Sequence, residues 1–197
     1  MGELSYQRTV IAYHGCDESV VTDVLLRGQQ LKASANDYDW LGRGIYFWEH
    51  GPQRALEWAR QRRDIAKPAV LGAFLHLGNC FDLVLTACTR RLGEIYERYR
   101  HHCDQRRIPI PQNLPAQGEA GSDLVLRYLD CAVLNWGLDF LEHEVGLCFH
   151  TVRGVFTEGQ PAFPGSRIMA KSHIQVAVRD ASVIIGSFKP SVDSLAV

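Results

Sequence analysis

The chain has 197 residues, of which 46% are apolar and 22% are charged, and its formal net charge is −1 at pH 7. These values are typical of one ordinary globular domain that buries a substantial core. The balanced charge gives no overall electrostatic reason to expect a nucleic acid or a membrane as the partner, although it does not exclude a local basic patch.

The cysteines and the apolar segments exclude several further classes. Six cysteines occur singly, with no CxxC pair, so neither a zinc ribbon nor a dense disulfide framework is indicated and we expect reduced, mostly buried thiols. The first ten residues are polar, and no stretch approaches the roughly 18 consecutive apolar residues of a membrane span. We therefore expect a cytoplasmic protein without a membrane span or a metal centre.

The first two predicted elements are a strand and a helix. Residues 9–15 have strand propensity and place the polar His14 at the strand's exit. Apolar residues then recur at helical spacing over residues 19–27, with Ser19 as the N-cap and Gly28 as the stop.

A Gly-Arg-Gly turn at residues 42–44 leads into a short strand of large residues, 45–48. Two glycines around one residue usually mark a backbone with positive φ or a place where another group approaches closely. A helix begins near Pro52, and residues 69–77 are apolar enough for a strand in a covered sheet.

The sequence changes character between about residues 83 and 148. Residues 85–107 predict a helix with six arginines, residues 108–122 are rich in proline and glycine, and residues 123–142 predict a second amphipathic helix. We interpret residues 83–148 as a helical insertion between two parts of a sheet.

The remaining predicted elements are strands at 151–157 and 173–178, joined by a long loop, and one more at 182–188. This order of elements predicts a single α+β domain over residues 1–197, not a doubly wound fold. The usual nucleotide motifs are missing from the sequence: there is no GxxxxGK[ST], and the 42–44 turn precedes a strand where a Rossmann turn would precede a helix.

Three pieces of sequence follow one another in a specific order: Tyr13-His14-Gly15, Gly42-Arg43-Gly44-Ile45-Tyr46-Phe47, and Trp58 one helix later. In this order they resemble the catalytic domain of the poly(ADP-ribose) polymerase-like ADP-ribosyltransferases, whose I-L-x-x-G-L helix is matched here by residues 24–29. The resemblance covers residues 10–60, returns near 173–188 and is absent from the insertion. It implies an α+β fold with split mixed and antiparallel sheets, flanking helices and NAD as co-substrate.

The resemblance also implies roles for the residues of the first half. His14 would hydrogen-bond a ribose hydroxyl of NAD, the Gly15 backbone would hold the nicotinamide carboxamide, and Gly44 would let the strand lie against the dinucleotide. Taken singly, such residues also have structural explanations, and His14 could be a satisfied core histidine.

Aromatic residues would enclose the nicotinamide. By resemblance, Tyr46 would stack on the ring and Trp58 would close the other side, with the small Ala55 on the same helix. Singly, Tyr46 could equally be a core aromatic and Trp58 an anchor on the helix face.

The last strand departs from the family pattern. Gln175 occupies the place of the glutamate that supports the transition state in the polymerase-type members, and an amide supplies neither a negative charge nor a proton acceptor of that kind. Either the protein transfers single ADP-ribose units or another carboxylate acts, and Glu158 is the first candidate, with a solvated turn residue as the alternative. His173 shares a strand face with Gln175 and would contact NAD or the acceptor, or make a structural hydrogen bond.

The arginines of residues 85–107 are interleaved with acids, which is typical of a solvated face. The functional alternative is a footprint for RNA or for an antitoxin-like partner. His101, His102, Cys103 and His143 lack a metal-binding motif.

The sequence therefore predicts an NAD-dependent mono-ADP-ribosyltransferase that modifies a protein or a nucleic acid, as a toxin or defence effector. The alternatives are an NAD glycohydrolase, a catalytically silent module that binds NAD or ADP-ribose, and an RNA-binding protein on an unrelated fold.

Overall fold

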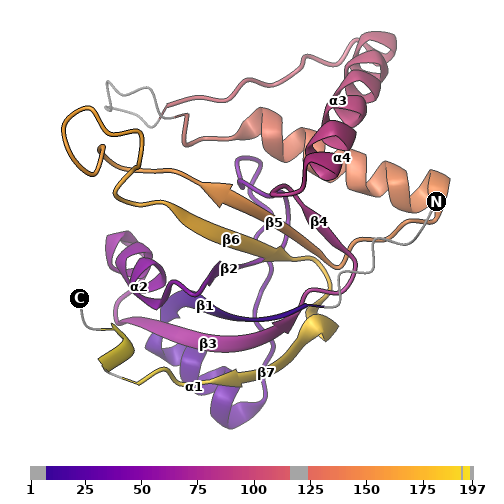
Figure 1. The fold of residues 1–197 in the computed structure, drawn as a ribbon. Coiled ribbons are helices and arrows are strands. Elements are labelled where there is room, and N and C mark those ends of the chain that lie inside the picture. The colour runs from indigo at the N-terminus through magenta and orange to yellow at the C-terminus, as the bar shows by residue number, and fades with distance from the viewer. Residues whose placement is uncertain (1–7, 116–123, 192, 196–197) are drawn as a thin grey trace.

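The computed structural model describes residues 8–115, 124–191 and 193–195. One seven-stranded sheet has the order β4-β5-β6-β2-β1-β3-β7 (Figure 1). Neighbouring strands are antiparallel except β4 and β5, which are parallel. The strands are β1 (Thr9–Asp17), β2 (Ile45–Glu49), β3 (Pro68–His76), β4 (Cys80–Asp82), β5 (Thr151–Phe156), β6 (His173–Val178) and β7 (Ile184–Phe188).

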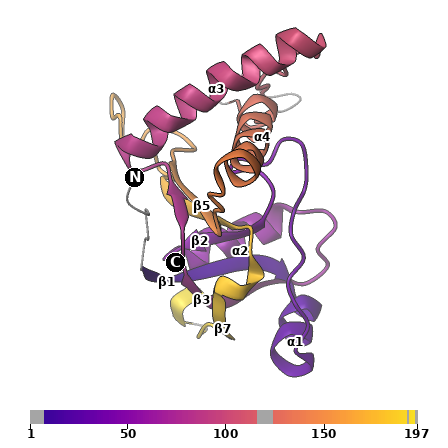
Figure 2. The ribbon, with the colours of Figure 1, turned by 90° about the vertical axis from the view of Figure 1, so that its right-hand side faces the viewer.

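Four α-helices accompany the sheet in the described parts of the chain, so the predicted α+β class is confirmed. They are α1 (Glu18–Arg27), α2 (Pro52–Gln61), α3 (Thr86–Arg106) and α4 (Tyr128–Val145), and two short 3₁₀ helices are η1 (Ala181–Val183) and η2 (Asp193–Leu195). Helix α2 packs on β1 and β3, whereas α4 lies between α3 and the β5 end of the sheet (Figures 1 and 2).

The two halves of the sheet are joined only weakly. Strands β1 and β2 pair through Ala12 with Glu49 and Tyr13 with Trp48, whereas β1 pairs with β3 along its whole length. The expected division into separate sheets is therefore not present, because this short pairing makes the sheet continuous. Beyond Tyr13 the two strands diverge, and the candidate site lies at this end of the sheet.

Several predicted boundaries need correction. The N-cap of α1 is Asp17, whose Oδ1 accepts the N–H of Ser19 at 3.0 Å, so Ser19 is not the cap. Gly28 ends the helix as predicted, with a φ of 66°. Among the described residues, the second helix of the insertion begins only at Tyr128, and its predicted start at 123 lies outside them. Strand β4 was not predicted.

All six cysteines are free thiols, and five of them are buried, as the sequence predicts. No helix within the described segments is long and apolar enough to cross a membrane.

Candidate functional site

A cavity of about 430 Å³ lies where β1 and β2 diverge. We call it the cleft. Its walls come from the end of β1, residues 32–40, β2, the exposed side of α2, residues 125–126, the start of the β5–β6 loop and β6. The lining residues are His14, Gly15, Lys32, Ser34, Asn36, Tyr38, Asp39, Trp40, Tyr46, Trp48, Arg54, Trp58, Gln61, Arg62, Val125, Leu126, Glu158 and Gln175.

His14 is held in one tautomer. Its Nδ1 lies 2.7 Å from the carbonyl oxygen of Tyr46, and since a carbonyl only accepts, Nδ1 carries the proton. Burial lowers the pKa of His14, although the bond to Tyr46 opposes this shift. The imidazole is therefore neutral at pH 7, and its Nε2 is a hydrogen-bond acceptor, as a ribose hydroxyl would require.

Gly15 presents its backbone to the cleft. The carbonyl of Ile11 accepts the N–H of His50 on the β2 side of β1, and alternation along a strand places the polar groups of Gly15 on that same side, beyond the last β1–β2 pair. A Cβ at Gly15 would lie 2.2 Å from the carbonyl oxygen of Ala55. Glycine thus allows α2 to pack on β1 while its own amide edge faces the cavity.

Tyr46 divides its ring and its hydroxyl between two tasks. The hydroxyl accepts the N–H of Leu41 at 2.8 Å and donates to the carbonyl of Gly42 at 2.7 Å. Burial raises the pKa of the phenol, so it stays protonated. With the hydroxyl engaged in the preceding turn, the half-buried ring is the part available for stacking on a ligand.

The tryptophans form one wall. The rings of Trp48 and Trp58 lie 5.7 Å apart, and the guanidinium of Arg62 lies 5.4 Å from the Trp58 ring. Trp48 is buried, whereas Trp58 is 38% exposed and so offers a face to a ligand.

Gln175 and His173 form a connected pair on β6. Nδ1 of His173 lies 2.8 Å from the carbonyl of Lys171 and must donate to it, so Nε2 accepts the amide N–H of Gln175 at 2.9 Å. Burial lowers the pKa of His173, while Lys171 and Glu158 oppose this. His173 does not line the cleft. It orients the Gln175 amide with the amide nitrogen toward the imidazole, which leaves the amide oxygen as the acceptor for another partner.

Glu158 is a carboxylate that lies beside this pair. Its Oε1 lies 3.5 Å from Nε2 of His173, and its Oε2 accepts from Nη2 of Arg54 at 3.3 Å. Arg54 also contacts Glu57, which binds Lys171 at the other end of the β5–β6 loop. The contacts of Arg54 with Glu158 and Glu57, and of Glu57 with Lys171, join the loop to α2 and hold the carboxylate at the cavity wall.

Besides His173, two predicted ligand residues, Gly44 and Ala55, lie outside the cleft. A Cβ at Gly44 would lie 2.9 Å from the carbonyl of Val178, so this glycine accommodates β6, not a dinucleotide. Ala55 is fully buried beneath α2 with Leu56 and Val70. Both residues are small because protein atoms approach them.

Sequence reasoning missed Arg54, Asp39 and the wall at residues 125–126. Arg54 was detectable, because it precedes Trp58 by four residues and therefore shares its helix face. The wall was not, since it belongs to the segment that the resemblance leaves out. There Nε1 of Trp40 donates to the carbonyl of Val125 at 2.7 Å, and Arg127 lies over the Trp40 ring at 4.5 Å.

Arg98 and Arg100 lie on different faces of α3. Arg100 binds Glu97 and Asp104 on its own helix, whereas Arg98 lies 5.6 Å from the Phe140 ring of α4. Two positions along a helix differ by about 200° around its axis, so these side chains leave in different directions. This arrangement does not favour α3 as a nucleic-acid footprint.

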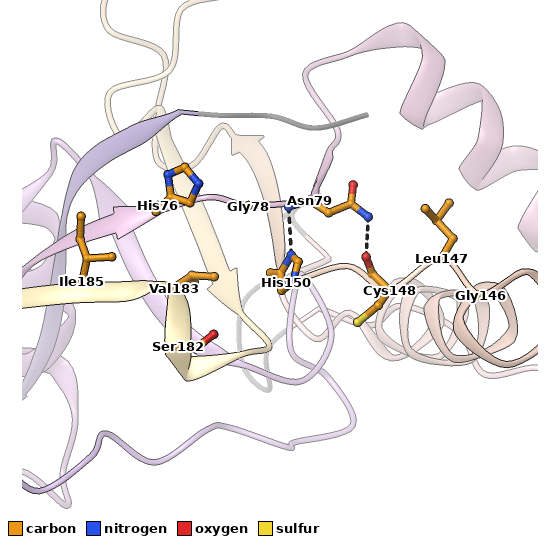
Figure 3. A pocket seen from close by; sticks show the side chains of 10 residues that line it. All are labelled: His76, Gly78, Asn79, Gly146, Leu147, Cys148, His150, Ser182, Val183 and Ile185. Carbon is orange, nitrogen blue, oxygen red and sulfur yellow. Dashed lines mark hydrogen bonds between the residues drawn. The ribbon is translucent and has the colours of Figure 1, made fainter. Parts of the chain in front are cut away.

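A larger cavity of about 590 Å³ lies at the opposite end of the sheet (Figure 3). Its lining residues are His76, Gly78, Asn79, Gly146, Leu147, Cys148, His150, Ser182, Val183 and Ile185. Nδ1 of His150 accepts the backbone N–H of Asn79 at 3.0 Å, so that nitrogen is not available as a base. The lining contains no carboxylate, lysine or arginine and none of the predicted site residues. The smaller cleft is therefore the better candidate site. Across the described residues, no three His, Cys, Asp or Glu side chains are grouped to hold a metal ion.

Comparisons with known proteins leave the family open. No family model matches the chain, and a search of curated proteins gives no match.

Proposed function

We propose that the protein is an NAD-dependent ADP-ribosyltransferase of the poly(ADP-ribose) polymerase-like kind, which transfers a single ADP-ribose to a protein or nucleic acid. One observation carries the proposal: His14, Tyr46, Trp58, Glu158 and Gln175, which are far apart in the sequence, line one cavity. Its volume lies within the range of ordinary ligand pockets.

Each lining group has a task suited to its chemistry. The Nε2 of His14 and the Gln175 amide oxygen would accept ribose hydroxyls, and the Gly15 backbone would pair with the carboxamide. Tyr46 and Trp58 would stack on nicotinamide. In the reaction, the bond between nicotinamide and ribose C1′ breaks, nicotinamide takes the electron pair, and an acceptor atom binds C1′ as it loses its proton.

Glu158 would supply the charge that Gln175 lacks. Its carboxylate would stabilise positive charge on the ribose, or accept the proton of the acceptor. The free thiols support a reducing compartment, and we propose the cytoplasm as the location of the protein and of a neutralising partner, if it is a toxin.

The test combines calorimetry with NAD, chromatography of released nicotinamide and mass spectrometry of cell-extract proteins and nucleic acids. We expect binding, release and an ADP-ribose adduct. Release without an adduct would identify an NAD glycohydrolase, and binding without release a silent module, which Gln175 favours. Tyr46→Ala should lose NAD binding, and if it binds as wild type the cleft is misassigned.

A further inference from the structure

Helix α4 contacts the turn before β2 through two side chains one helical turn apart. Oδ1 of Asn135 accepts the backbone N–H of Arg43 at 2.9 Å. Asp139 accepts from both terminal nitrogens of the Arg43 guanidinium, with Nη1 at 2.8 Å from Oδ2 and Nη2 in contact with Oδ1. The backbone and the side chain of Arg43 are thus bound by the same helix face.

The fit between α4 and this turn is close. Gly42 has a φ of 74°, and a Cβ there would lie 2.6 Å from Oδ1 of Asn135. A side chain would be strained by the backbone conformation and would displace Asn135. The two conditions explain the glycine before Arg43 without any ligand.

The turn before β2 also fixes the position of Tyr46. The N–H of Leu41 and the carbonyl of Gly42 are the two partners of the Tyr46 hydroxyl, so the ring in the cleft is anchored to the segment that α4 holds. Asp139 also accepts from Nη2 of the largely buried Arg179 at 3.0 Å. Arg179 directly follows β6, the strand of Gln175, so one carboxylate connects the turn before β2 with the end of β6, and both strands supply residues to the cleft.

The carboxylate of Asp139 keeps two like charges together. Burial opposes its ionisation, but Arg43 and Arg179 hold the pKa of Asp139 below its usual value. Without this carboxylate the two guanidiniums would repel each other, and the turn would move away from α4.

We propose that Asn135 and Asp139 are positioning residues, which hold the Tyr46 ring in place for the ligand of the cleft through Arg43. The choice of NAD as that ligand rests on the proposed function, whereas the link from α4 to Tyr46 does not. Helix α4 of the insertion then contributes to the site by positioning Tyr46.

Two variants remove the contacts between α4 and Arg43, and two further variants serve as controls. Asp139→Ala and Asn135→Leu should each weaken NAD binding about tenfold, the effect of losing a hydrogen bond that involves a charged or buried group. Asn135→Asp retains an oxygen acceptor for the Arg43 N–H and should bind NAD within about threefold of wild type. The matched control is Glu97→Ala, which removes a carboxylate bound to Arg100 on α3 and should leave the affinity unchanged.

Amide hydrogen exchange provides a readout that needs no NAD. The Leu41 N–H, which the Tyr46 hydroxyl accepts, should exchange faster in Asp139→Ala and Asn135→Leu than in wild type, but not in Glu97→Ala. If Asp139→Ala does not fold, Asp139→Asn keeps the shape without the charge and should show the same direction of change.

The proposal is wrong if folded Asp139→Ala and Asn135→Leu retain wild-type NAD affinity and wild-type protection of the Leu41 N–H. This holds even if the two variants lose thermal stability, because the residues would then be merely structural. If wild type itself does not bind NAD, the proposed function fails, while faster Leu41 exchange would still support the positioning role.

Discussion

Among the described residues, the clusters around Arg153 and Arg54 both join one arginine to two carboxylates but differ in their access to solvent. In the closed cluster, Arg153 binds Glu49 through Nε at 2.6 Å and Asp82 through Nη1 at 3.0 Å, and these side chains are at most 5% exposed. In the open cluster, Arg54 binds Glu57 and Glu158, with side chains 20–36% exposed at the cleft.

The difference shows how one chemistry serves two purposes. The closed cluster joins β2, β4 and β5, and both carboxylates use Arg153 to offset their burial, since an unpaired buried charge is very unfavourable. The open cluster is weaker as a stabilising element, because water screens it. Its carboxylate at the cavity wall remains available for chemistry.

The sharpest test of this contrast is Glu158→Gln in the open cluster. If the carboxylate carries charge or accepts a proton, turnover should fall about 100- to 10,000-fold with little change in NAD affinity. Gln175→Glu should retain much of the geometry, whereas Gln175→Ala should weaken both binding and rate. Single-turnover kinetics and calorimetry separate these outcomes. Full activity in Glu158→Gln would make Glu158 a loop residue.

The corresponding change in the closed cluster is Asp82→Ala. It leaves Arg153 partly uncompensated in the core and should lower the free energy of unfolding by about 3–5 kcal/mol. Urea denaturation measures this loss. The surface control Asp64→Ala removes an exposed partner of Arg62 and should cost less than about 1 kcal/mol. A similar small value for Asp82→Ala would mean that the closed cluster contributes no more than a surface pair.

The smallest expected effect comes from pH. Burial lowers the pKa of both His14 and His173, so their neutral forms favour the folded state above about pH 6.5, and this contribution is lost as the pH falls below it. A protonated His173 cannot accept the Gln175 amide, so NAD affinity should fall a few-fold between pH 7 and pH 5.5. His173→Asn should have a shallower pH dependence in the same titration. If wild type and His173→Asn show the same pH dependence of NAD affinity, His173 does not orient Gln175 for binding.

Local features of the fold were predictable because their causes are local. Strand β6 has the predicted bounds, and Gly28 ends α1 because a left-handed residue follows the helix. Strand β4 was missed because three residues carry no periodicity, and they become a strand only by pairing with β5. Asp17, which caps α1, also accepts the N–H of Lys67, a distant residue that no local pattern includes.

The candidate site also combines features that the sequence predicts with features that depend on distant contacts. By itself the sequence determined which residue types were present, and their resemblance to a known family predicted that His14, Tyr46, Trp58 and Gln175 would lie together, as they do in the cleft. Only the tertiary structure decided that Gly44 and Ala55 face protein atoms, that Arg54 holds Glu158, and that α4 holds Arg43 across 96 positions of sequence. Such contacts depend on how separate elements pack, and no local pattern of residues encodes which distant side chain will meet them.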